Sequence, residues 1–520
     1  MTELTAPGLL PTLKGQPVLV LGLGVSGLAM VRACAASGAV VTVADTRPSP
    51  PYASTLAAEL PEVAVLCAAF DARLVAHAPW RLVCRSQGIA PAQMSGLRQA
   101  AADAGVPVVG ELDLFAMALL ALRGQQPPYE PKVIAITGTN GKTTTTSLTG
   151  HLLRKAGWDV EVAGNIGYAL LDALGDRLAA GRLPKAWVLE LASFQLDDAQ
   201  LFEPTVATVL NITQDHLDWH SDMAAYAAAK ARVFGAGGQM LLNRDDATVM
   251  QMAPAAAAPS GNGRTLKGRP ARDVSTFGSG MPQAAGDFGC EQVNGMTWLV
   301  RALPADETRR KRHEAAEALH FQRLMPADAL RIRGRHNALN ALAALALASA
   351  AGCPLAPMLY GLREYRGEPH RVESVAIIDG VEYFDDSKGT NVGATAAAMH
   401  GLGVERRVVL ILGGEGKGQD FSPLIEPVSR YARAVVLIGR DAPIIREALI
   451  PAGVAPVDAV SMAEAVQCAG RLAQAGDAVL LSPACASFDM FDNYQHRAQV
   501  FCAAVADLAL ASGAQMEAGT

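Results

Sequence analysis

The chain has 520 residues, of which 50% are hydrophobic, 18% charged and 5% aromatic. A composition this apolar excludes a disordered protein, and at roughly 150 residues per domain the length predicts three or four domains. The 44 basic and 50 acidic residues leave a net charge of −6, which gives no general attraction to nucleic acid or to an anionic membrane.

Cysteine spacing and hydropathy indicate the compartment. The eight cysteines never form a C-x-x-C pair, so the sequence predicts neither a zinc knuckle nor a dense disulfide framework, and a reducing environment fits best. The first ten residues lack a basic leader segment, and no segment holds about 18 unbroken apolar residues. We therefore expect a cytoplasmic protein without membrane insertion.

Short β-branched runs recur along the chain, each followed by a Gly-rich turn and an Ala-rich stretch. Strands that alternate with helices predict an α/β fold with parallel sheets. The expected strands are residues 18–21, 40–44, 133–137, 187–190, 408–412, 435–438 and 478–481. A Pro-rich joint at 123–132 and a second joint near 365–370 divide the chain. Between about 252 and 331 the pattern weakens, and we expect a β-meander with an insertion.

The first strand leads into a glycine-rich turn, G-L-G-V-S-G at residues 22–27, and the next strand ends at Asp45. In such a βαβ unit the glycines let backbone amides approach a diphosphate, and an acidic residue at the second strand can contact a ribose. Taken alone, the pattern is typical of an NAD-dependent enzyme. A tight turn without a ligand stays open, because the motif by itself is weak.

The strongest local signal is T-G-T-N-G-K-T-T at residues 137–144, where a strand enters a turn that opens a helix. Amides of this turn can hold phosphate oxygens, Lys142 can neutralise charge on the β- and γ-phosphates, and Thr143 can ligate Mg²⁺. Ile136 stands where the full P-loop pattern has its first glycine, so a turn without a ligand stays open here as well.

Candidate metal ligands follow this loop. Glu190 ends an apolar strand, and His216 lies in N-I-T-Q-D-H-L-D at residues 211–218, directly after another strand. Each has an ordinary alternative, a surface acid for Glu190 and a helix cap for His216. Because the carboxyl ends of parallel strands meet at one crevice, their positions favour a shared site. The local sequence makes Lys230 only an exposed helix lysine.

Seven strings, taken in order, resemble the Mur ligases of peptidoglycan synthesis over most of the chain. They are T-G-T-N-G-K-T at residues 137–143, G-N-I-G at 164–167, E-L-A-S-F-Q-L at 190–196, N-I-T-Q-D-H-L-D at 211–218, D-D-S-K-G-T-N at 385–391, G-G-E-G-K-G at 413–418 and L-S-P-A-C-A-S-F-D at 481–489. The first and fourth strings mark the superfamily, and the last two point to its D-glutamate-adding branch.

The resemblance implies three α/β domains. They are a Rossmann-like UDP-binding domain at residues 1–120, a P-loop-type ATP-binding domain at 121–367 with the insertion at about 252–331, and a Rossmann-like C-terminal domain at 368–520 for amino acid and ATP. The implied activity is an ATP-dependent amide ligase that adds D-glutamate to UDP-N-acetylmuramoyl-L-alanine through an acyl phosphate, giving ADP and phosphate. The implied partners are these small molecules, and we expect a monomer.

The same resemblance assigns the catalytic residues and the ligands of ATP and metal. Lys142, His216 and Lys230 would be catalytic, with Lys230 carried as an N-carboxylated, or carbamylated, lysine. Two Mg²⁺ ions would be held by Thr143, Glu190, His216 and carbamylated Lys230. ATP would contact Gly138, Thr139, Asn140, Gly141, Lys142, Thr143, Thr144, Asn337, Asn340, His370, Arg371 and Asp386.

The resemblance also assigns the other two substrates. D-glutamate would be held by Lys388, Thr390, Lys417, Ser487 and Phe488. Two lysines with hydroxyl donors suit a dianionic amino acid. The UDP-linked acceptor would contact Val25, Ser26, Thr46, Arg47, Ser86, Gly88, Asn165 and His216. The N-terminal glycine turn is then a UDP site and not an NAD site.

Four positions depart from the family pattern. Gln87 replaces the proline of S-P-G, Ala192 a serine, Gly389 an alanine and Tyr494 a phenylalanine, and none of these changes removes a group that does chemistry.

Three alternatives stay open: another Mur ligase such as the L-alanine-adding enzyme, an NAD-dependent dehydrogenase, and a nucleotide sensor that binds ATP without turnover.

Overall fold

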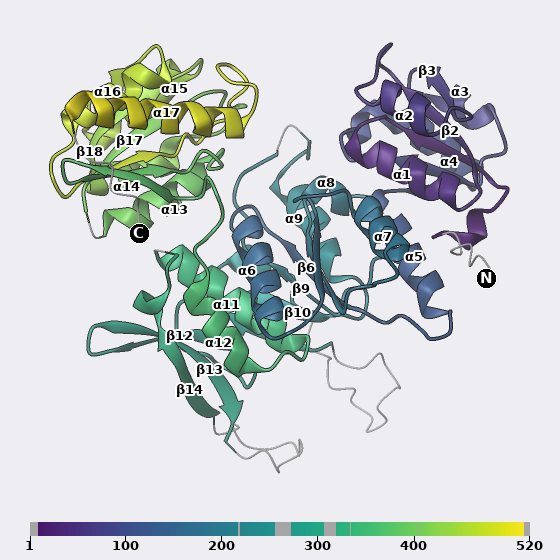
Figure 1. Ribbon diagram of the computed structural model, residues 1–520, viewed down its shortest axis with the longest axis horizontal. Helices are drawn as coiled ribbons and strands as arrows, with labels where there is room; N and C mark the ends of the chain where they lie inside the picture. The colour runs from purple at the N-terminus through teal and green to yellow at the C-terminus, as the bar shows by residue number, and fades with distance from the viewer. Residues whose placement is uncertain are drawn as a thin grey trace, which may run out of the picture.

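The β-branched runs of the sequence form strands, and their side chains are buried because helices cover the sheets (Figure 1). The computed structural model describes residues 9–216, 219–254, 272–305, 319–332, 334–404 and 406–513. In this part of the chain the strands form three sheets, one after another along the sequence, which confirms the predicted α/β fold with three sheet-containing domains. Within those ranges no helix is long and apolar enough to span a bilayer.

The N-terminal sheet is parallel, in the strand order β3-β2-β1-β4-β5. Its middle strand alternates between two faces: Val18 and Val20 pack in one apolar cluster, Leu19 and Leu21 in another. The strands are β1 (Pro17–Leu21), β2 (Val40–Asp45), β3 (Ala64–Cys67), β4 (Leu82–Arg85) and β5 (Val108–Val109). The helices are α1 (Val25–Ala36), α2 (Ala53–Glu59), α3 (Ala72–Ala76), α4 (Ser95–Asp103) and α5 (Glu111–Arg123).

The central sheet has the strand order β14-β13-β12-β11-β10-β9-β6-β8-β7, and strands β6 to β11 run parallel. These strands are β6 (Lys132–Thr137), β7 (Val160–Gly164), β8 (Ala186–Glu190), β9 (Val206–Val209), β10 (Gln239–Asn243) and β11 (Val274–Phe277). The helices are α6 (Lys142–Lys155), α7 (Leu170–Ala179), α8 (Ser193–Leu196), α9 (Met223–Ala231), α10 (Ala247–Met250), α11 (Arg335–Ala350) and α12 (Leu355–Glu364).

The stretch expected to hold a β-meander and an insertion contains an antiparallel meander. Strand β12 (Phe288–Val293) pairs with β13 (Met296–Pro304), and β13 pairs with β14 (Leu319–Pro326). The prediction of a meander is thus confirmed. Residues 255–271 and 306–318, on which much of the expected insertion falls, lie outside the described residues.

The C-terminal sheet has the strand order β15-β16-β20-β17-β18-β19, parallel except for the antiparallel edge strand β15. The strands are β15 (Glu373–Ile378), β16 (Val381–Asp385), β17 (Val408–Gly413), β18 (Ala432–Ile438), β19 (Val457–Asp458) and β20 (Ala478–Leu481). The helices are α13 (Val392–Gly403), α14 (Ile425–Tyr431), α15 (Ala442–Leu449), α16 (Met462–Leu472) and α17 (Tyr494–Ser512). In Figure 1 this domain and the N-terminal domain lie apart, each above the central domain.

Helix α5 fixes the N-terminal domain to the central one. It follows β5 directly, and its Phe115 ring packs edge-on against Trp187 of strand β8, with 5.1 Å between the ring centroids. Residues of both domains therefore belong to one apolar cluster. The first two domains share a core, although the polar joint at 123–132 separates them in the sequence.

Candidate active site

The phosphate loop, residues 137–144, joins strand β6 to helix α6. Gly138 and Gly141 have φ values of 152° and 81°, conformations that strain any residue with a side chain. A Cβ at Gly141 would also lie 2.6 Å from Oδ1 of Asn340. Glycines therefore permit the sharp turn that presents the first amides of α6, where a helix N-terminus favours an anion.

Two lysines lie at this loop. Nζ of Lys142 donates to the carbonyl oxygens of Gly138 and Thr139, both at 2.8 Å. Nζ of Lys230 donates to the carbonyl of Gly138 at 2.9 Å and to Oγ1 of Thr137 at 3.3 Å. Burial lowers the pKa of both lysines, and the charge of Lys142 lowers the pKa of Lys230 further.

The interpretation of Lys230 as an exposed helix lysine is wrong, because its side chain is 1% exposed. It lies in the last turn of α9, and its Nζ is 4.7 Å from the ring centre of Tyr226. The string Y-A-A-A-K suits a solvent-facing helix and a buried one equally well. Only the packing of α9 in the folded domain decides between them.

Glu190 ends strand β8 as predicted and is 2% exposed, so the surface-acid alternative is wrong. Its Oε1 accepts a hydrogen bond from Nδ2 of Asn165 at 3.0 Å. Its Oε2 is buried and has no hydrogen-bond partner among the described residues. A buried carboxylate oxygen without a donor is costly, and a cation would satisfy it.

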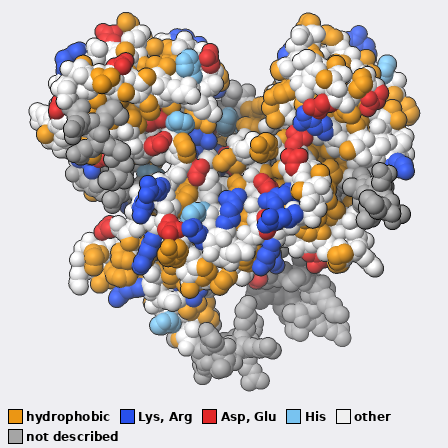
Figure 2. All heavy atoms as spheres, in the orientation of Figure 1, with side chains coloured by type: hydrophobic (Ala, Val, Ile, Leu, Met, Phe, Trp, Pro, Cys, Tyr) orange, Lys and Arg blue, Asp and Glu red, His pale blue; other side chains and the backbone are white. Residues whose placement is uncertain are grey.

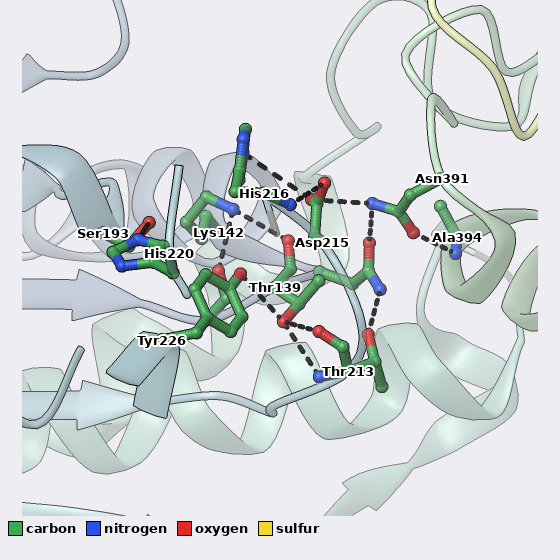
Figure 3. Close-up of polar contacts among 12 residues, drawn as sticks. Thr139, Lys142, Ser193, Thr213, Asp215, His216, His220, Tyr226, Asn391 and Ala394 are labelled. Carbon is green, nitrogen blue, oxygen red and sulfur yellow. Dashed lines mark hydrogen bonds and ion pairs between the residues drawn. The ribbon is translucent and has the colours of Figure 1, made fainter. Parts of the chain in front are cut away.

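His216 follows strand β9 in the chain, and Figure 3 shows it beside Asp215 and Lys142. Its φ is 52°, and its Nε2 lies 3.7 Å from Oδ2 of Asp215. Thr139 joins this segment to the phosphate loop: its Oγ1 donates to the carbonyl of Thr213 at 3.0 Å and lies 3.1 Å from the hydroxyl of Tyr226. The strand ends that we expected to converge do so here.

The C-terminal domain reaches the same loop with two side chains. Nη2 of Arg371 donates to Oγ1 of Thr143 at 2.7 Å. Asn391 caps helix α13, and its Nδ2 donates to Oδ1 of Asn140 at 3.1 Å and to Oδ2 of Asp215 at 3.4 Å (Figure 3). Sequence reasoning quoted Asn391 within a motif but gave it no role.

A pocket beside the loop lies between the central and C-terminal domains. Its lining includes seven residues that the resemblance assigns to ATP: Asn140, Gly141, Thr144, Asn337, Asn340, Arg371 and Asp386. Burial raises the pKa of Asp386 to about 7, although Ser482 donates a hydrogen bond to it at 2.7 Å. His370 lies outside this lining, and its Nδ1 is 2.7 Å from Oδ2 of Asp385. The side-chain amides of the asparagines in this lining could bind a base, and the guanidinium of Arg371 could bind a phosphate, so the pocket suits a nucleotide.

A second pocket at the same boundary is lined by Asp215 and His216 of the central domain and by Thr390 and Lys417 of the C-terminal domain. Nζ of Lys417 lies 5.9 Å from the ring centre of Phe488, and both side chains are exposed. Two predicted D-glutamate residues, Thr390 and Lys417, therefore share a pocket with a predicted acceptor residue.

The remaining D-glutamate candidates lie on the strings after strands β16 and β20. Ser487 is buried, and Lys388 is half-buried with its Nζ 5.4 Å from the ring centre of Tyr494. Burial lowers the pKa of Lys388 to about 8. The two strings are joined by Arg497, which is 1% exposed and donates to the carbonyls of Ser387 at 2.7 Å and Cys485 at 3.1 Å. Sequence reasoning missed Arg497, because its position in a helix gave no sign of burial.

The N-terminal glycine turn presents its candidates at the end of strand β1. Val25, Thr46, Arg47 and Gly88 are exposed, whereas Ser26 and Ser86 are buried. Both oxygens of Asp45 accept hydrogen bonds from the protein, one from the amide of Leu23 at 2.8 Å and both from Arg47, which holds the pKa of Asp45 at about 2. An NAD ribose would need this carboxylate, so the geometry disfavours the dehydrogenase alternative.

Three family models match the chain: a Mur ligase MurD-like N-terminal domain over residues 16–110, the Mur ligase middle domain over 136–263 and the Mur ligase glutamate ligase domain over 370–485. A UDP-N-acetylmuramoylalanine–D-glutamate ligase of Albidiferax ferrireducens is 62% identical over 97% of this chain and 99% of its own length. The chain belongs to the Mur ligase family. A Mur ligase of the same name from Burkholderia mallei is 56% identical over 95% of this chain and 98% of its own.

Solved structures of Mur ligases share the fold. MurF of Thermotoga maritima in complex with ADP has a TM-score of 0.56 at 15% identity, with 98% of this chain and 100% of that chain covered. MurC of the same organism has a TM-score of 0.52 at 16% identity, covering 95% and 100%. In Figure 2, Lys and Arg side chains gather over the middle of the molecule, below two lobes. Basic side chains are therefore concentrated on part of this face, although the net charge of the chain is −6.

Proposed function

We propose that this Mur ligase adds D-glutamate to UDP-N-acetylmuramoyl-L-alanine with ATP, giving ADP and phosphate. The observation that carries the proposal is the second pocket, where His216 of the central domain shares a lining with Thr390 and Lys417 of the C-terminal domain. An acceptor carboxylate activated at the phosphate loop would meet there the amine of an acidic amino acid. The relative that is 62% identical bears this activity in its name.

The chemistry requires a cationic loop. A carboxylate does not acylate an amine, because oxide would have to leave; transfer of the γ-phosphoryl group to the carboxylate makes phosphate the leaving group. Two anions must approach each other in that step. Lys142 and the amides at the start of α6 would lower their repulsion, and Arg371 would add a positive charge from the C-terminal domain through its contact with Thr143.

We propose two Mg²⁺ ions at this loop, held by Thr143, Glu190, His216 and carbamylated Lys230. Three of the four donors suit a hard cation, because Thr143 offers a hydroxyl oxygen and Glu190 and the carbamate offer carboxylate oxygens, while His216 adds an imidazole nitrogen. Oε2 of Glu190 is buried without a donor among the described residues. Bound Mg²⁺ would neutralise charge on the phosphate and carboxylate oxygens.

Carbamylation would turn the Lys230 side chain from a cation into a carboxylate. The unprotonated amine attacks the carbon of CO₂, an N–C bond forms and one proton leaves. Burial and the charge of Lys142 lower the pKa of Lys230, which favours the unprotonated amine that this step needs. Nζ of Lys142 and Nζ of Lys230 both donate to the carbonyl of Gly138, so two ammonium groups there would repel each other. A carbamate on Lys230 would instead attract the Lys142 ammonium.

We propose the following places for the substrates, on domains at residues 1–120, 121–367 and 368–520. The diphosphate of the acceptor lies at the amides of Val25 and Ser26, its uracil at Thr46 and Arg47, further contacts at Ser86 and Gly88, and its peptide end at Asn165 and His216. D-glutamate lies among Lys388, Thr390, Lys417, Ser487 and Phe488. Since one chain supplies all of these residues, we propose a monomer. The cysteines of the described residues are free thiols, which supports a cytoplasmic location.

Phosphate release tests the proposed function. The purified chain is incubated with ATP and Mg²⁺ and either UDP-N-acetylmuramoyl-L-alanine with D-glutamate or UDP-N-acetylmuramate with L-alanine. We expect phosphate and an amide product only in the first mixture. Turnover only in the second mixture would identify an L-alanine-adding enzyme instead, and ATP binding without phosphate release would indicate a sensor. A separate mixture with a nicotinamide cofactor and without ATP tests the third alternative, because a change in nicotinamide absorbance there would favour a dehydrogenase.

Lys388 should give D-glutamate binding a pH dependence. Its lowered pKa of about 8 leaves the ammonium charged below that pH and neutral above it. Because the charged form binds a carboxylate, we expect KM for D-glutamate to rise about fivefold from pH ~8 to pH ~9. The Lys388→Arg variant should lose this rise, since a guanidinium stays charged. Initial rates at saturating ATP and acceptor measure it, and an equal rise in both proteins would contradict the assignment.

A further inference from the structure

Arg85 lies at the boundary between the N-terminal and central domains and is 2% exposed. It is the last residue of β4, and its guanidinium contacts both domains. Nη1 donates to the carbonyl of Ile89 at 2.6 Å, within its own domain. In the central domain, Nη2 donates to the carbonyl of Phe194 at 3.0 Å and Nε donates to the carboxylate of Asp198.

Asp198 is the shared anion of a buried ion cluster. It is 4% exposed, and Nη2 of Arg98 on α4 is its second partner. A buried carboxylate has a large desolvation cost, which two cations with good hydrogen bonds can offset. Because both arginines come from one domain and the carboxylate from the other, the cluster fixes the two domains relative to each other.

Two aromatic rings connect Arg85 to His216. The Arg85 guanidinium lies over the Trp219 ring, 5.6 Å from its centre. The Phe194 ring packs edge-on against the His216 imidazole, with centroids 5.8 Å apart, and its contact with the Trp219 ring is tilted, with centroids 5.7 Å apart. Arg85 therefore holds the backbone of Phe194, whose ring touches the imidazole. It also contacts the ring of Trp219, which packs against the Phe194 ring.

A second connection joins the same domains through Glu111, which is 8% exposed. Its Oε2 accepts from the hydroxyl of Ser26 at 2.8 Å, and its Oε1 accepts from the amide of Leu171 at 3.0 Å. Ser26, like Ser86 directly after Arg85, is assigned above to the UDP-linked acceptor. The N-terminal acceptor-binding segments are thus fixed to the central domain at two points, of which the Arg85 point leads to His216.

We infer that Arg85 is a positioning residue, which orients the His216 imidazole toward the UDP-linked acceptor through Phe194 and Trp219. The inference rests on the proposed function, because that proposal places the acceptor between Ser86 and His216. Arg85 and Asp198 are 113 positions apart, so no local pattern in the sequence announces their contact.

The test compares the wild type with Arg85→Met and Arg85→Lys. Methionine keeps part of the apolar stem without any donor, and lysine keeps a charge beside Asp198 but lacks the planar fork that serves three acceptors at once. We expect both variants to raise KM for the acceptor about tenfold and to lower kcat several-fold, with KM for ATP within about twofold. Lysine should recover part of the thermal stability that methionine loses, without recovering KM.

Arg433→Met is the matched control. Arg433 pairs with the buried Asp477 near the amino ends of β18 and β20, whereas the site residues follow the carboxyl ends of their strands. This variant should lower the unfolding temperature as Arg85→Met does but leave KM for the acceptor unchanged. An unchanged acceptor KM in Arg85→Met, or its recovery in Arg85→Lys, would overturn the positioning role.

Amide hydrogen exchange separates this inference from the proposed function, because it needs no turnover. In Arg85→Met the amides of residues 190–196 should exchange at least about tenfold faster than in the wild type. A wild type that does not join D-glutamate to the acceptor would refute the proposed function. Unchanged exchange at 190–196 would refute the positioning role alone.

Discussion

Replacing Lys230 with alanine is expected to lower kcat about a thousandfold while the protein stays folded. In the proposed site the variant loses the carbamate, and with it one ligand for Mg²⁺. Helix α9 should keep its place, because Tyr226 and Ala229 on the same helix stay buried. Phosphate release with saturating substrates measures the loss, and circular dichroism checks the fold.

Chemical rescue distinguishes a lost carboxylate from general damage around Lys230. Bicarbonate or a short carboxylic acid should restore part of the activity of Lys230→Ala, because either can place a carboxylate in the space that the side chain leaves. In the wild type, growth with ¹³C-bicarbonate should give a carbamate carbon signal that the variant lacks. Lys132→Ala, an exposed lysine at the other end of β6, is the control and should keep full activity. The carbamate would be contradicted if folded Lys230→Ala were not rescued and if its carbon spectrum did not differ from that of the wild type. Lys230 would then be a plain amine.

The strands were predictable because their signal is local. The run V-L-V-L at residues 18–21 alternates between two apolar clusters, one on each face of its sheet, so every residue in it had to be apolar. The phosphate loop was predictable for the same reason, since glycines with positive φ and a following lysine lie within a few residues. From the sequence, Glu190 and His216 could be placed only as residues that follow strands. Because the carboxyl ends of parallel strands converge, that placement was enough to predict that they share a site.

Contacts between distant segments could not be predicted. The burial of Lys230 depends on how α9 packs, and its own helix is Ala-rich on every side. Asn391 meets Asn140 over a separation of 251 positions, and Arg497 meets Ser387 over 110. These hydrogen bonds are strong because they are buried in the folded chain. From residue types alone, many other polar residues could pair equally well with each of these side chains. The family resemblance supplied some of these positions, but it gave no role to Arg497 or Arg85.

Replacing Lys142 with methionine is expected to reduce ATP-dependent phosphate release about a thousandfold. Its Nζ is held over the loop by the carbonyls of Gly138 and Thr139, beside the first amides of α6. Methionine keeps the apolar stem but supplies no charge where the γ-phosphoryl group would transfer. The loss should fall mainly on kcat, because in the proposed site the loop amides and Asn340, which lines the pocket beside the loop, would still bind the rest of the nucleotide.

Lys155→Met is the matched control for Lys142→Met, because Lys155 ends the same helix α6 and pairs at the surface with Glu364. Since a surface ion pair contributes little, this variant should stay within about twofold of the wild type in kcat and in KM for ATP. Equilibrium binding of a non-hydrolysable ATP analogue then separates binding from chemistry. If Lys142→Met released phosphate at more than about a tenth of the wild-type rate, charge neutralisation by Lys142 would make only a minor contribution to lowering the activation barrier. The main role in charge neutralisation would then belong to the loop amides, Arg371 and the proposed metal ions.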